Sequence, residues 1–215
     1  MPTADYAKAL LQEVAARYAS ITSYSDCWEV HRHLDDNSSV FTTIFSTLYK
    51  MPSLYRFEFE RPHPYPPLQG IVTRNAVIFD GSTAYTWRQS GTDAPQAKCA
   101  ESLSLAIAGA TGVSSGSAHR IGRLLIPAMG GLSIVDLVDL RQREDTVVDG
   151  TPCYSVAARY PKSTTVDMEF VIEKDALLIR RILTLGGASR FSATELRHSI
   201  HVDEPIDDAM FRRAA

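Results

Sequence analysis

SLSLAIAGATGVSSGSAHRIGRLLIPAMGGLSIVDLVDL, residues 102–140, interrupts a chain that otherwise has the pattern of β-strands. The segment is rich in small and apolar residues, carries few charges and is helical rather than strand-like in pattern. The segments on either side alternate between apolar and polar residues, which is typical of half-buried strands. Helices without a clear polar face must be covered, and we expect this insertion to lie against the inner face of a curved sheet.

The segments before and after the insertion predict short strands joined mostly by tight turns. Tyr55, Phe57 and Phe59 alternate with charged residues, so one face of that strand is expected to be buried. Asp80-Gly81 lies between two alternating segments and favours a tight hairpin. The same arrangement recurs after the insertion, and the count gives about ten or eleven strands in an antiparallel meander.

The first helix is the clearest single element in the sequence. In residues 4–20, Leu10, Leu11, Val14 and Tyr18 recur at helical spacing, and polar residues occupy the other faces. A sheet of ten strands or more is expected to curl or close rather than stay flat. The predicted fold class is therefore α+β, with an N-terminal helix, one long antiparallel sheet and one helical insertion in a single domain.

Composition excludes several classes of function. The net charge of −3 argues against a general nucleic-acid binder, which would be basic. No apolar run approaches the roughly 18 residues that a membrane span requires. Residues 1–18 lack the pattern of a signal peptide. We therefore expect a periplasmic or otherwise extracytoplasmic protein if an export signal was trimmed, and a cytoplasmic one otherwise.

The sequence contains no motif that points to catalysis or to a cofactor. Patterns of phosphate-binding loops, serine hydrolases, zinc proteases and EF-hands are absent from it. His31 and His33 would share a strand face, but they alternate with Trp28 and Val30, which favours solvent exposure over metal binding. The three cysteines lack CxxC spacing. We expect no catalytic residue, no metal site and no cofactor.

The strands carry more large apolar side chains than one small insertion needs as packing partners. A curved sheet encloses more volume than a Gly- and Ala-rich insertion fills, and pockets for apolar ligands are lined in this way. Burying an acyl chain yields about 0.8 kcal/mol per methylene, so such a cavity is sufficient for binding. Each of these residues could equally be an ordinary core residue. The predicted strand lining is Trp28, Phe41, Phe45, Phe57, Phe59, Tyr85, Trp87, Met168 and Phe170.

Six segments, spread over nearly the whole chain, follow one another in a recognisable order. They are YASITSYS (18–25), STLYKMPSLYRFEF (46–59), AVIFDGSTAYTW (76–87), VVDGTPCYSVAARYP (147–161), VIEKDALLIRRI (171–182) and IDDAMF (206–211). Their order resembles that of the outer-membrane lipoprotein carriers, the LolA/LolB-like family.

The resemblance implies an unclosed antiparallel β-barrel in a single domain, residues 1–215, with residues 102–140 as a helical lid. It also implies an apolar cavity between sheet and lid that accepts the acyl chains of lipoproteins. By position, the resemblance adds further residues to the cavity lining. These are Tyr49 and Tyr55 on the strands and Leu103, Ile107, Leu124, Leu125 and Leu137 in the lid.

We therefore expect a non-catalytic, monomeric binding or carrier protein. Its ligand would be a lipid, the acyl chain of a lipoprotein or another hydrophobic molecule, and nucleic acid is not expected as a partner. Peripheral contact with a membrane or with envelope proteins is compatible with this role. Two alternatives stay open: an enzyme acting on a small apolar or aromatic substrate in the same cavity, and an envelope module whose sheet edge binds a partner protein.

Overall fold

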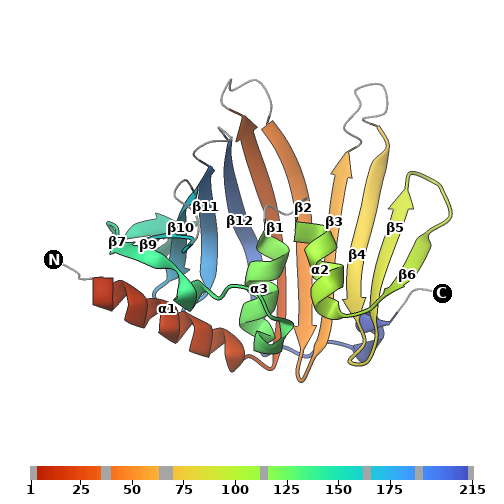
Figure 1. The fold of residues 1–215 in the computed structure, drawn as a ribbon, viewed down its shortest axis with the longest axis horizontal. Helices are drawn as coiled ribbons and strands as arrows, with labels where there is room; N and C mark the ends of the chain where they lie inside the picture. Colours follow the sequence, from red (N-terminus) through yellow and green to blue (C-terminus); the bar gives the residue numbers. More distant parts are fainter. Residues whose placement is uncertain are drawn as a thin grey trace. The chain divides into compact units, whose positions relative to one another are not determined.

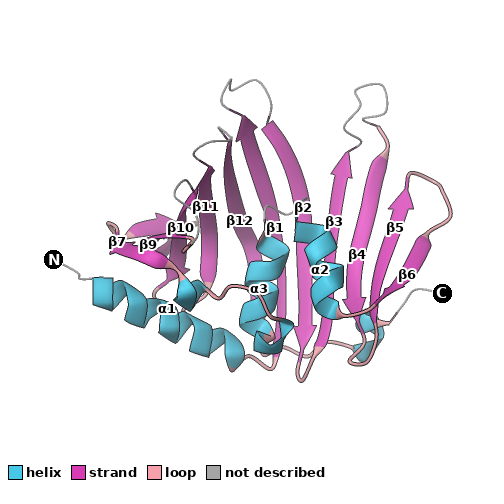
Figure 2. Ribbon diagram, in the orientation of Figure 1, coloured by secondary structure: helices cyan, strands magenta, loops and turns pink. Residues whose placement is uncertain are grey.

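The computed structural model of the chain describes residues 4–34, 40–62, 70–111, 116–161, 166–186 and 191–212. The fold class is α+β, as predicted, with helices and one twelve-stranded antiparallel sheet (Figure 2). In chain order the elements are α1 (Ala4–Ala19), β1 (Ser23–Leu34), β2 (Val40–Lys50), β3 (Leu54–Pro62), β4 (Val72–Phe79), β5 (Ala84–Ser90), β6 (Gln96–Ala100), α2 (Leu103–Thr111), α3 (Ser117–Leu125), η2 (Pro127–Met129), η3 (Ile134–Asp136), β7 (Val138–Gln142), β8 (Thr146–Val148), β9 (Thr151–Arg159), β10 (Val166–Glu173), β11 (Ile179–Gly186), β12 (Phe191–Val202) and η4 (Asp208–Phe211).

The sheet follows a meander that is not closed. Its strand order is β6-β5-β4-β3-β2-β1-β12-β11-β10-β9-β7, and β8 pairs with β9 beside this path. The described part of the chain therefore has twelve strands, where the sequence predicts ten or eleven. Two of them, β6 and β8, are five and three residues long and lack a strong apolar alternation. Pairing with a neighbouring strand, rather than their own sequence pattern, makes these segments strands.

The chain divides into two compact units. The first comprises Met1–Ser20, Val30–Phe41 and Gly131–His198, and the second comprises Ile21–Glu29, Thr42–Gly130 and Ser199–Ala215.

In the first unit, α1 packs against β7 and η3. Its apolar stripe is buried as the sequence predicts, including Leu10, Leu11 and Val14. The Tyr18 hydroxyl accepts a hydrogen bond of 3.1 Å from the Ile179 backbone N–H, which ties the end of the helix to β11. The first helix is thus held by apolar burial along its length and, near its end, by this hydrogen bond to β11.

In the second unit, aromatic side chains of β1, β2 and β3 form one packed cluster. Phe45 pairs with Phe59 across β2 and β3, and Thr47 pairs with Phe57, so these side chains share one face of the sheet. Trp28 stacks on Phe45 with ring centroids 4.3 Å apart. All four aromatic rings are buried. This cluster is the apolar centre of the second unit.

The insertion forms α2, α3 and η2 in the second unit and η3 in the first. Figure 1 shows α2 and α3, both in green, against one face of the strands, and α2 contacts α3, β4, β5 and β6. Helical structure ends at Asp136, and residues 138–140, which the sequence assigns to the insertion, begin β7. The reason is the pairing of Val138 with Arg159 in β9, a contact distant in sequence.

The C-terminal segment of the second unit packs on β3 through η4, and Phe211 is buried there. Arg56 donates a hydrogen bond of 2.6 Å to the Met210 carbonyl. Lys50 forms an ion pair of 2.5 Å with Asp208. Because side chains alternate along a strand, Arg56 lies on the face opposite Phe57, so η4 occupies the other face of the sheet from the aromatic cluster.

Candidate functional site

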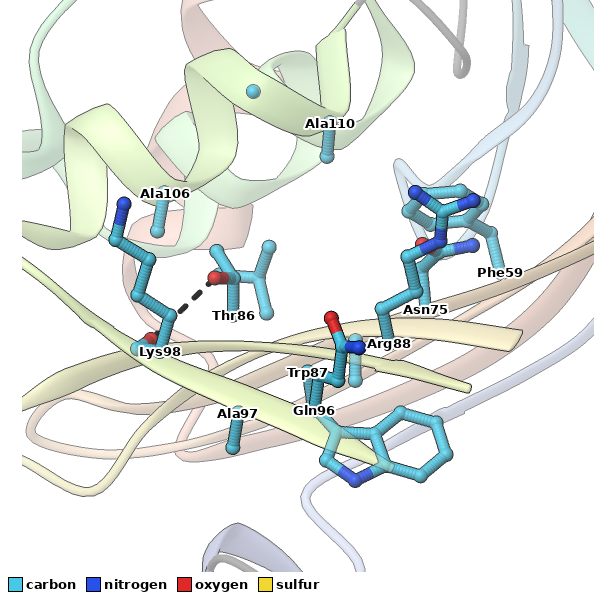
Figure 3. A pocket seen from close by; sticks show the side chains of 13 residues that line it. Phe59, Asn75, Thr86, Trp87, Arg88, Gln96, Ala97, Lys98, Ala106 and Ala110 are labelled. Atoms are coloured by element: carbon cyan, nitrogen blue, oxygen red, sulfur yellow. Dashed lines mark hydrogen bonds between the residues drawn. The ribbon is translucent and has the colours of Figure 1, made fainter. Parts of the chain in front are cut away.

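A pocket of about 560 Å³ lies between α2 and the strands β4, β5 and β6 (Figure 3). This volume is within the range of about 300–1,000 Å³ that is usual for ligand sites in proteins. All of its lining belongs to the second unit. The lining residues are Phe59, Asn75, Ala76, Val77, Thr86, Trp87, Arg88, Gln96, Ala97, Lys98, Ala106, Gly109 and Ala110.

Strand register explains which side chains face the pocket. Paired residues of adjacent strands lie on the same face of a sheet, and residues two apart on one strand do so as well. One row across β3, β4, β5 and β6 consists of Phe59, Asn75, Arg88 and Gln96. The neighbouring row consists of Phe57, Val77, Thr86 and Lys98. Both rows lie on the face that α2 covers.

The helix side of the pocket is made of very small residues. Ala106 and Ala110 contribute only methyl groups, and Gly109 contributes no side chain at all. A Cβ atom placed on Gly109 would meet no atom within 4 Å. Space remains here because α2 supplies no bulk and the strands below it carry medium-sized or flexible side chains instead of the aromatic rings found on β2 and β3.

The polar groups of the lining are two cations, two amides and one hydroxyl. Figure 3 shows Lys98 reaching toward α2 beside Ala106, and Arg88 beside Asn75 and Phe59. The Thr86 hydroxyl on β5 donates a hydrogen bond of 3.4 Å to the Lys98 carbonyl on the adjacent strand β6. The side of the pocket formed by α2 is therefore apolar and made of small residues, whereas Arg88 and Lys98 form a positively charged rim on the strand side.

Most of the aromatic residues predicted to line a cavity are packed in the core beside this pocket. Of them, Phe59 contributes to the lining and is 8% exposed. The Phe41 side chain lies outside the described residues. Residues buried in the second unit without contacting the pocket are Trp28, Phe45, Tyr49, Tyr55, Phe57, Leu103, Ile107, Leu124 and Leu125. Leu137, Met168 and Phe170 are buried in the first unit. Ligand binding by these residues stays a prediction.

Tyr85 and Trp87 share a face of the sheet, as the alternation predicts. This face is the one opposite Phe57 and α2. Tyr85 pairs with Ile78, and Trp87 pairs with Ala76, whereas Thr86 and Arg88 occupy the face below α2. Trp87 borders the pocket, but Figure 3 shows its indole pointing away from α2. The orientation expected from the sequence is corrected here, because alternation pairs residues on a face without revealing which face is covered.

Trp87 also borders a second pocket of about 320 Å³. Ile44, Glu58 and Arg74, which line it, belong to the face of the sheet opposite the aromatic cluster, and Ile44 is exposed. Arg74 forms an ion pair of 2.7 Å with Glu60 in this region. The charges of this second pocket are thus mixed, in contrast to the first.

Burial changes the acid–base behaviour of Tyr55 in β3 and of His119 in α3. Burial raises the pKa of the Tyr55 hydroxyl well above its usual value, and the negative charge of Asp26 adds to the effect. Burial lowers the pKa of His119 in α3, and the nearby cations Arg123 and Arg120 lower it further. Both effects favour the neutral forms of these side chains.

Among the described residues, no group of three or more His, Cys, Asp or Glu side chains comes together in a way that could hold a metal ion. None of the helices that the structure describes has the length and apolar character needed to cross a membrane.

The fold is shared with several solved bacterial proteins, although no protein-family model and no curated protein sequence matches the chain. LprF from Mycobacterium bovis is 11% identical, with a TM-score of 0.54 over 96% of each chain. The lipoprotein LppX from Mycobacterium tuberculosis is 12% identical, with a TM-score of 0.51 over 94% of this chain and 98% of LppX. These identities show a shared fold alone.

MucB, a protein of Pseudomonas aeruginosa, is 14% identical, and the match has a TM-score of 0.53 over 99% of this chain. The chain spans between 60% and 64% of the length of MucB in three structures. The chain therefore shares the fold of LprF, LppX and MucB, which agrees with the LolA/LolB-like fold that the order of its sequence segments predicts.

Proposed function

We propose that this protein binds a hydrophobic ligand, such as a lipid or the acyl chain of a lipoprotein, in the pocket beneath α2, and that it does so without catalysis. The observation that carries the proposal is the pocket of about 560 Å³ below Ala106, Gly109 and Ala110. The apolar part of its lining suits a hydrocarbon chain, which gains about 0.8 kcal/mol for each methylene removed from water.

The chemistry of the lining supports binding rather than turnover. Its polar members are Asn75, Thr86, Arg88, Gln96 and Lys98. General acid–base catalysis most often uses a histidine or a carboxylate with a shifted pKa, and neither type of group is among these lining residues. Amides, a hydroxyl and cations are instead suited to orienting a polar group at the end of an apolar ligand.

The shared fold supports a role in the cell envelope. LppX is a lipoprotein, and it matches nearly the whole of this chain. We extend the proposal to an extracytoplasmic protein that carries or senses its ligand as a monomer. Fractionation of cells that express the full-length gene tests the compartment, and recovery in the cytoplasm alone would contradict this part of the proposal.

A pair of substitutions in α2 tests the pocket itself. Gly109→Phe places a ring where a Cβ meets no other atom, so the variant is expected to fold and to fill the pocket. Ala108→Phe is the matched control, because Ala108 is the exposed neighbour and does not line the pocket. The probe is the neutral apolar dye N-phenyl-1-naphthylamine, with binding followed by its fluorescence.

We expect the unsubstituted protein and Ala108→Phe to bind the dye with similar affinity, and Gly109→Phe to bind at least tenfold more weakly. Circular dichroism of all three proteins verifies that they are folded. Equal affinity in the two variants would mean that the dye binds elsewhere and would contradict the proposal, as would a folded protein that binds no dye.

A further inference from the structure

We propose that Arg88 and Lys98 make the pocket selective for an anionic amphiphile, whose carboxylate or phosphate head group lies at this charged rim and whose hydrocarbon tail lies beneath α2. This inference rests on the proposed function and extends it by naming the class of ligand.

The two cations lie in a region where the described residues supply no balancing negative charge. Several other cations on the described strands and turns are paired with carboxylates: Arg56 with Glu58, Arg74 with Glu60, Lys174 with Asp145, and Arg180 with Glu173. Among the described residues, Arg88 and Lys98 have no such partner, and both are exposed. The described residues that line the pocket include no acidic side chain. In a chain of net charge −3, this is a local excess of positive charge.

The register of β5 and β6 places the two cations close to each other. Arg88 pairs with Gln96, and Thr86 pairs with Lys98, so Arg88 and Lys98 are diagonal neighbours. Diagonal neighbours have Cα atoms about 7–8 Å apart, a separation that long side chains can bridge. Figure 3 draws the Lys98 ammonium beside Ala106 and the Arg88 guanidinium beside Asn75 and Phe59. Both side chains are long, so a change of rotamer brings the two cations to one anionic group held above β5.

Two side-chain amides flank Arg88 and add hydrogen-bond donors to the site. Asn75 and Gln96 lie directly opposite Arg88 on the two adjacent strands and on the same face. Within the residues that the structure describes, neither side-chain amide is engaged in a hydrogen bond. A guanidinium donates two parallel hydrogen bonds to a carboxylate or phosphate, and flanking amides can satisfy the remaining oxygen lone pairs.

The pocket is polar on its strand side and apolar on its helix side. The row that contains Arg88 is polar on β4, β5 and β6. Facing these strands, α2 contributes the apolar surfaces of Ala106, Gly109 and Ala110. A ligand that satisfies both surfaces needs an anionic group and a hydrocarbon chain in the same molecule, which is the definition of an anionic amphiphile.

The test compares two probes with the same chain and different head groups, oleate and oleyl alcohol. The variants are Arg88→Gln and Lys98→Gln, and Arg74→Gln is the matched control. Arg74 is on the adjacent strand β4, but it lies on the opposite face and pairs with Glu60, and its substitution changes the net charge by the same amount.

We expect the unsubstituted protein to bind oleate more tightly than oleyl alcohol. Arg88→Gln and Lys98→Gln should each weaken oleate binding by about threefold to tenfold, because exposed ion pairs and charged hydrogen bonds have energies of this order. Neither should change the affinity for oleyl alcohol, and Arg74→Gln should change neither affinity. Added salt should weaken the binding of oleate alone, since exposed charges are screened.

Three results would overturn the inference: equal affinity for the two probes, an Arg88→Gln effect no larger than that of Arg74→Gln, or displacement of oleate by acetate alone at comparable concentration. The last result would show that a free anion occupies the rim. The proposed function fails separately, when Gly109→Phe binds both probes as well as the unsubstituted protein does.

Discussion

The hydroxyl oxygen of Tyr55 in β3 lies 3.3 Å from the backbone carbonyl oxygen of Ala118 in α3 and donates a hydrogen bond to it. The Tyr55 side chain is fully buried. On the same helix, a Cβ atom on Gly122 would come within 2.9 Å of this hydroxyl oxygen. One tyrosine therefore fixes α3 on the strands through a polar contact and through a close approach at a glycine.

Removing the Tyr55 hydroxyl should destabilise the protein. Tyr55→Phe leaves the buried Ala118 carbonyl without this donor, and we expect the free energy of unfolding to fall by about 1–2 kcal/mol in denaturant titrations. Tyr49→Phe is the control, because the Tyr49 hydroxyl makes no hydrogen bond to the described residues although the residue is buried. A loss of stability that is equal in the two variants would show that the contact with α3 contributes nothing.

Substitution of Gly122 in α3 and of Gly109 in α2 by alanine should change the stability of the protein in opposite directions. Gly122→Ala is expected to lower stability by about 1–3 kcal/mol through overpacking against Tyr55 and Met129. Gly109→Ala has open space for its methyl group and should raise stability by about 0.5–1 kcal/mol, because alanine favours the helix.

Thermal unfolding and denaturant titration measure both glycine variants. The double variant Tyr55→Phe with Gly122→Ala tests the contact between the added methyl group and Tyr55, since it removes the oxygen atom nearest to that methyl group. The double variant should lose less free energy of unfolding than the two single variants lose in sum. A strictly additive double variant would contradict this assignment of the clash.

The hairpin between β4 and β5 should lose stability at low pH through Asp80. Its carboxylate accepts hydrogen bonds from the backbone N–H groups of Thr83 and Ser82, at 2.8 and 2.9 Å, and these bonds lower the pKa of Asp80. A carboxyl whose pKa is lower in the folded state stabilises that state above the unfolded pKa, about 3.9. This contribution is lost as the pH falls below that value and through the folded pKa.

The stability difference between the unsubstituted protein and Asp80→Ala measures this contribution. We expect the difference to be constant between pH 6 and pH 7 and to shrink as the pH is lowered below about 4. A difference that stays constant down to the lowest pH at which the protein is folded would mean that the Asp80 carboxylate has the same pKa in both states.

A buried ion pair in the first unit should be sensitive to the loss of one partner. Glu195 and Arg197 on β12 are both fully buried, with Oε2 and Nη2 3.6 Å apart. Glu195→Gln removes a negative charge that pairs with the buried Arg197 guanidinium, and we expect a loss of about 3 kcal/mol or more in the free energy of unfolding.

Glu169→Gln is the control for the buried pair. Glu169 lies 3.8 Å from Arg181 in a partly exposed ion pair of the same unit. Loss of this exposed ion pair should lower the free energy of unfolding by about 0–1 kcal/mol, because water screens exposed pairs. The double variant Glu195→Gln with Arg197→Met should recover part of the stability lost in Glu195→Gln. Equal costs for the buried and the exposed pair would contradict the prediction.

Local patterns in the sequence predict much of the fold. The apolar stripe from Leu10 to Tyr18 identifies α1, and the alternation of aromatic residues identifies β3 together with its buried face. Both signals arise from burial that repeats with the period of the element itself. The helical character of residues 102–140 is evident for the same reason, although the end of this region at β7 is set by pairing with β9.

The pocket was harder to predict, because it depends on register between strands. Thr86 and Arg88 alternate with Tyr85 and Trp87, and the bulky pair is the natural choice for a buried face. The pairing of Thr86 with Val77 reverses this choice, and it cannot be read from either strand alone. The small residues of α2 were visible in the sequence, but their position above β4, β5 and β6 was not.

One wall of the pocket is also an end of the sheet. Strand β6, which contributes Gln96 and Lys98, is hydrogen-bonded to β5 and to no other described strand, whereas β4 has a partner on either side. Backbone amides of a short terminal strand open to solvent at a lower free energy than those of interior strands. Deuterium uptake should therefore be faster along β6 than along β4, and occupation of the pocket should slow it first at β6.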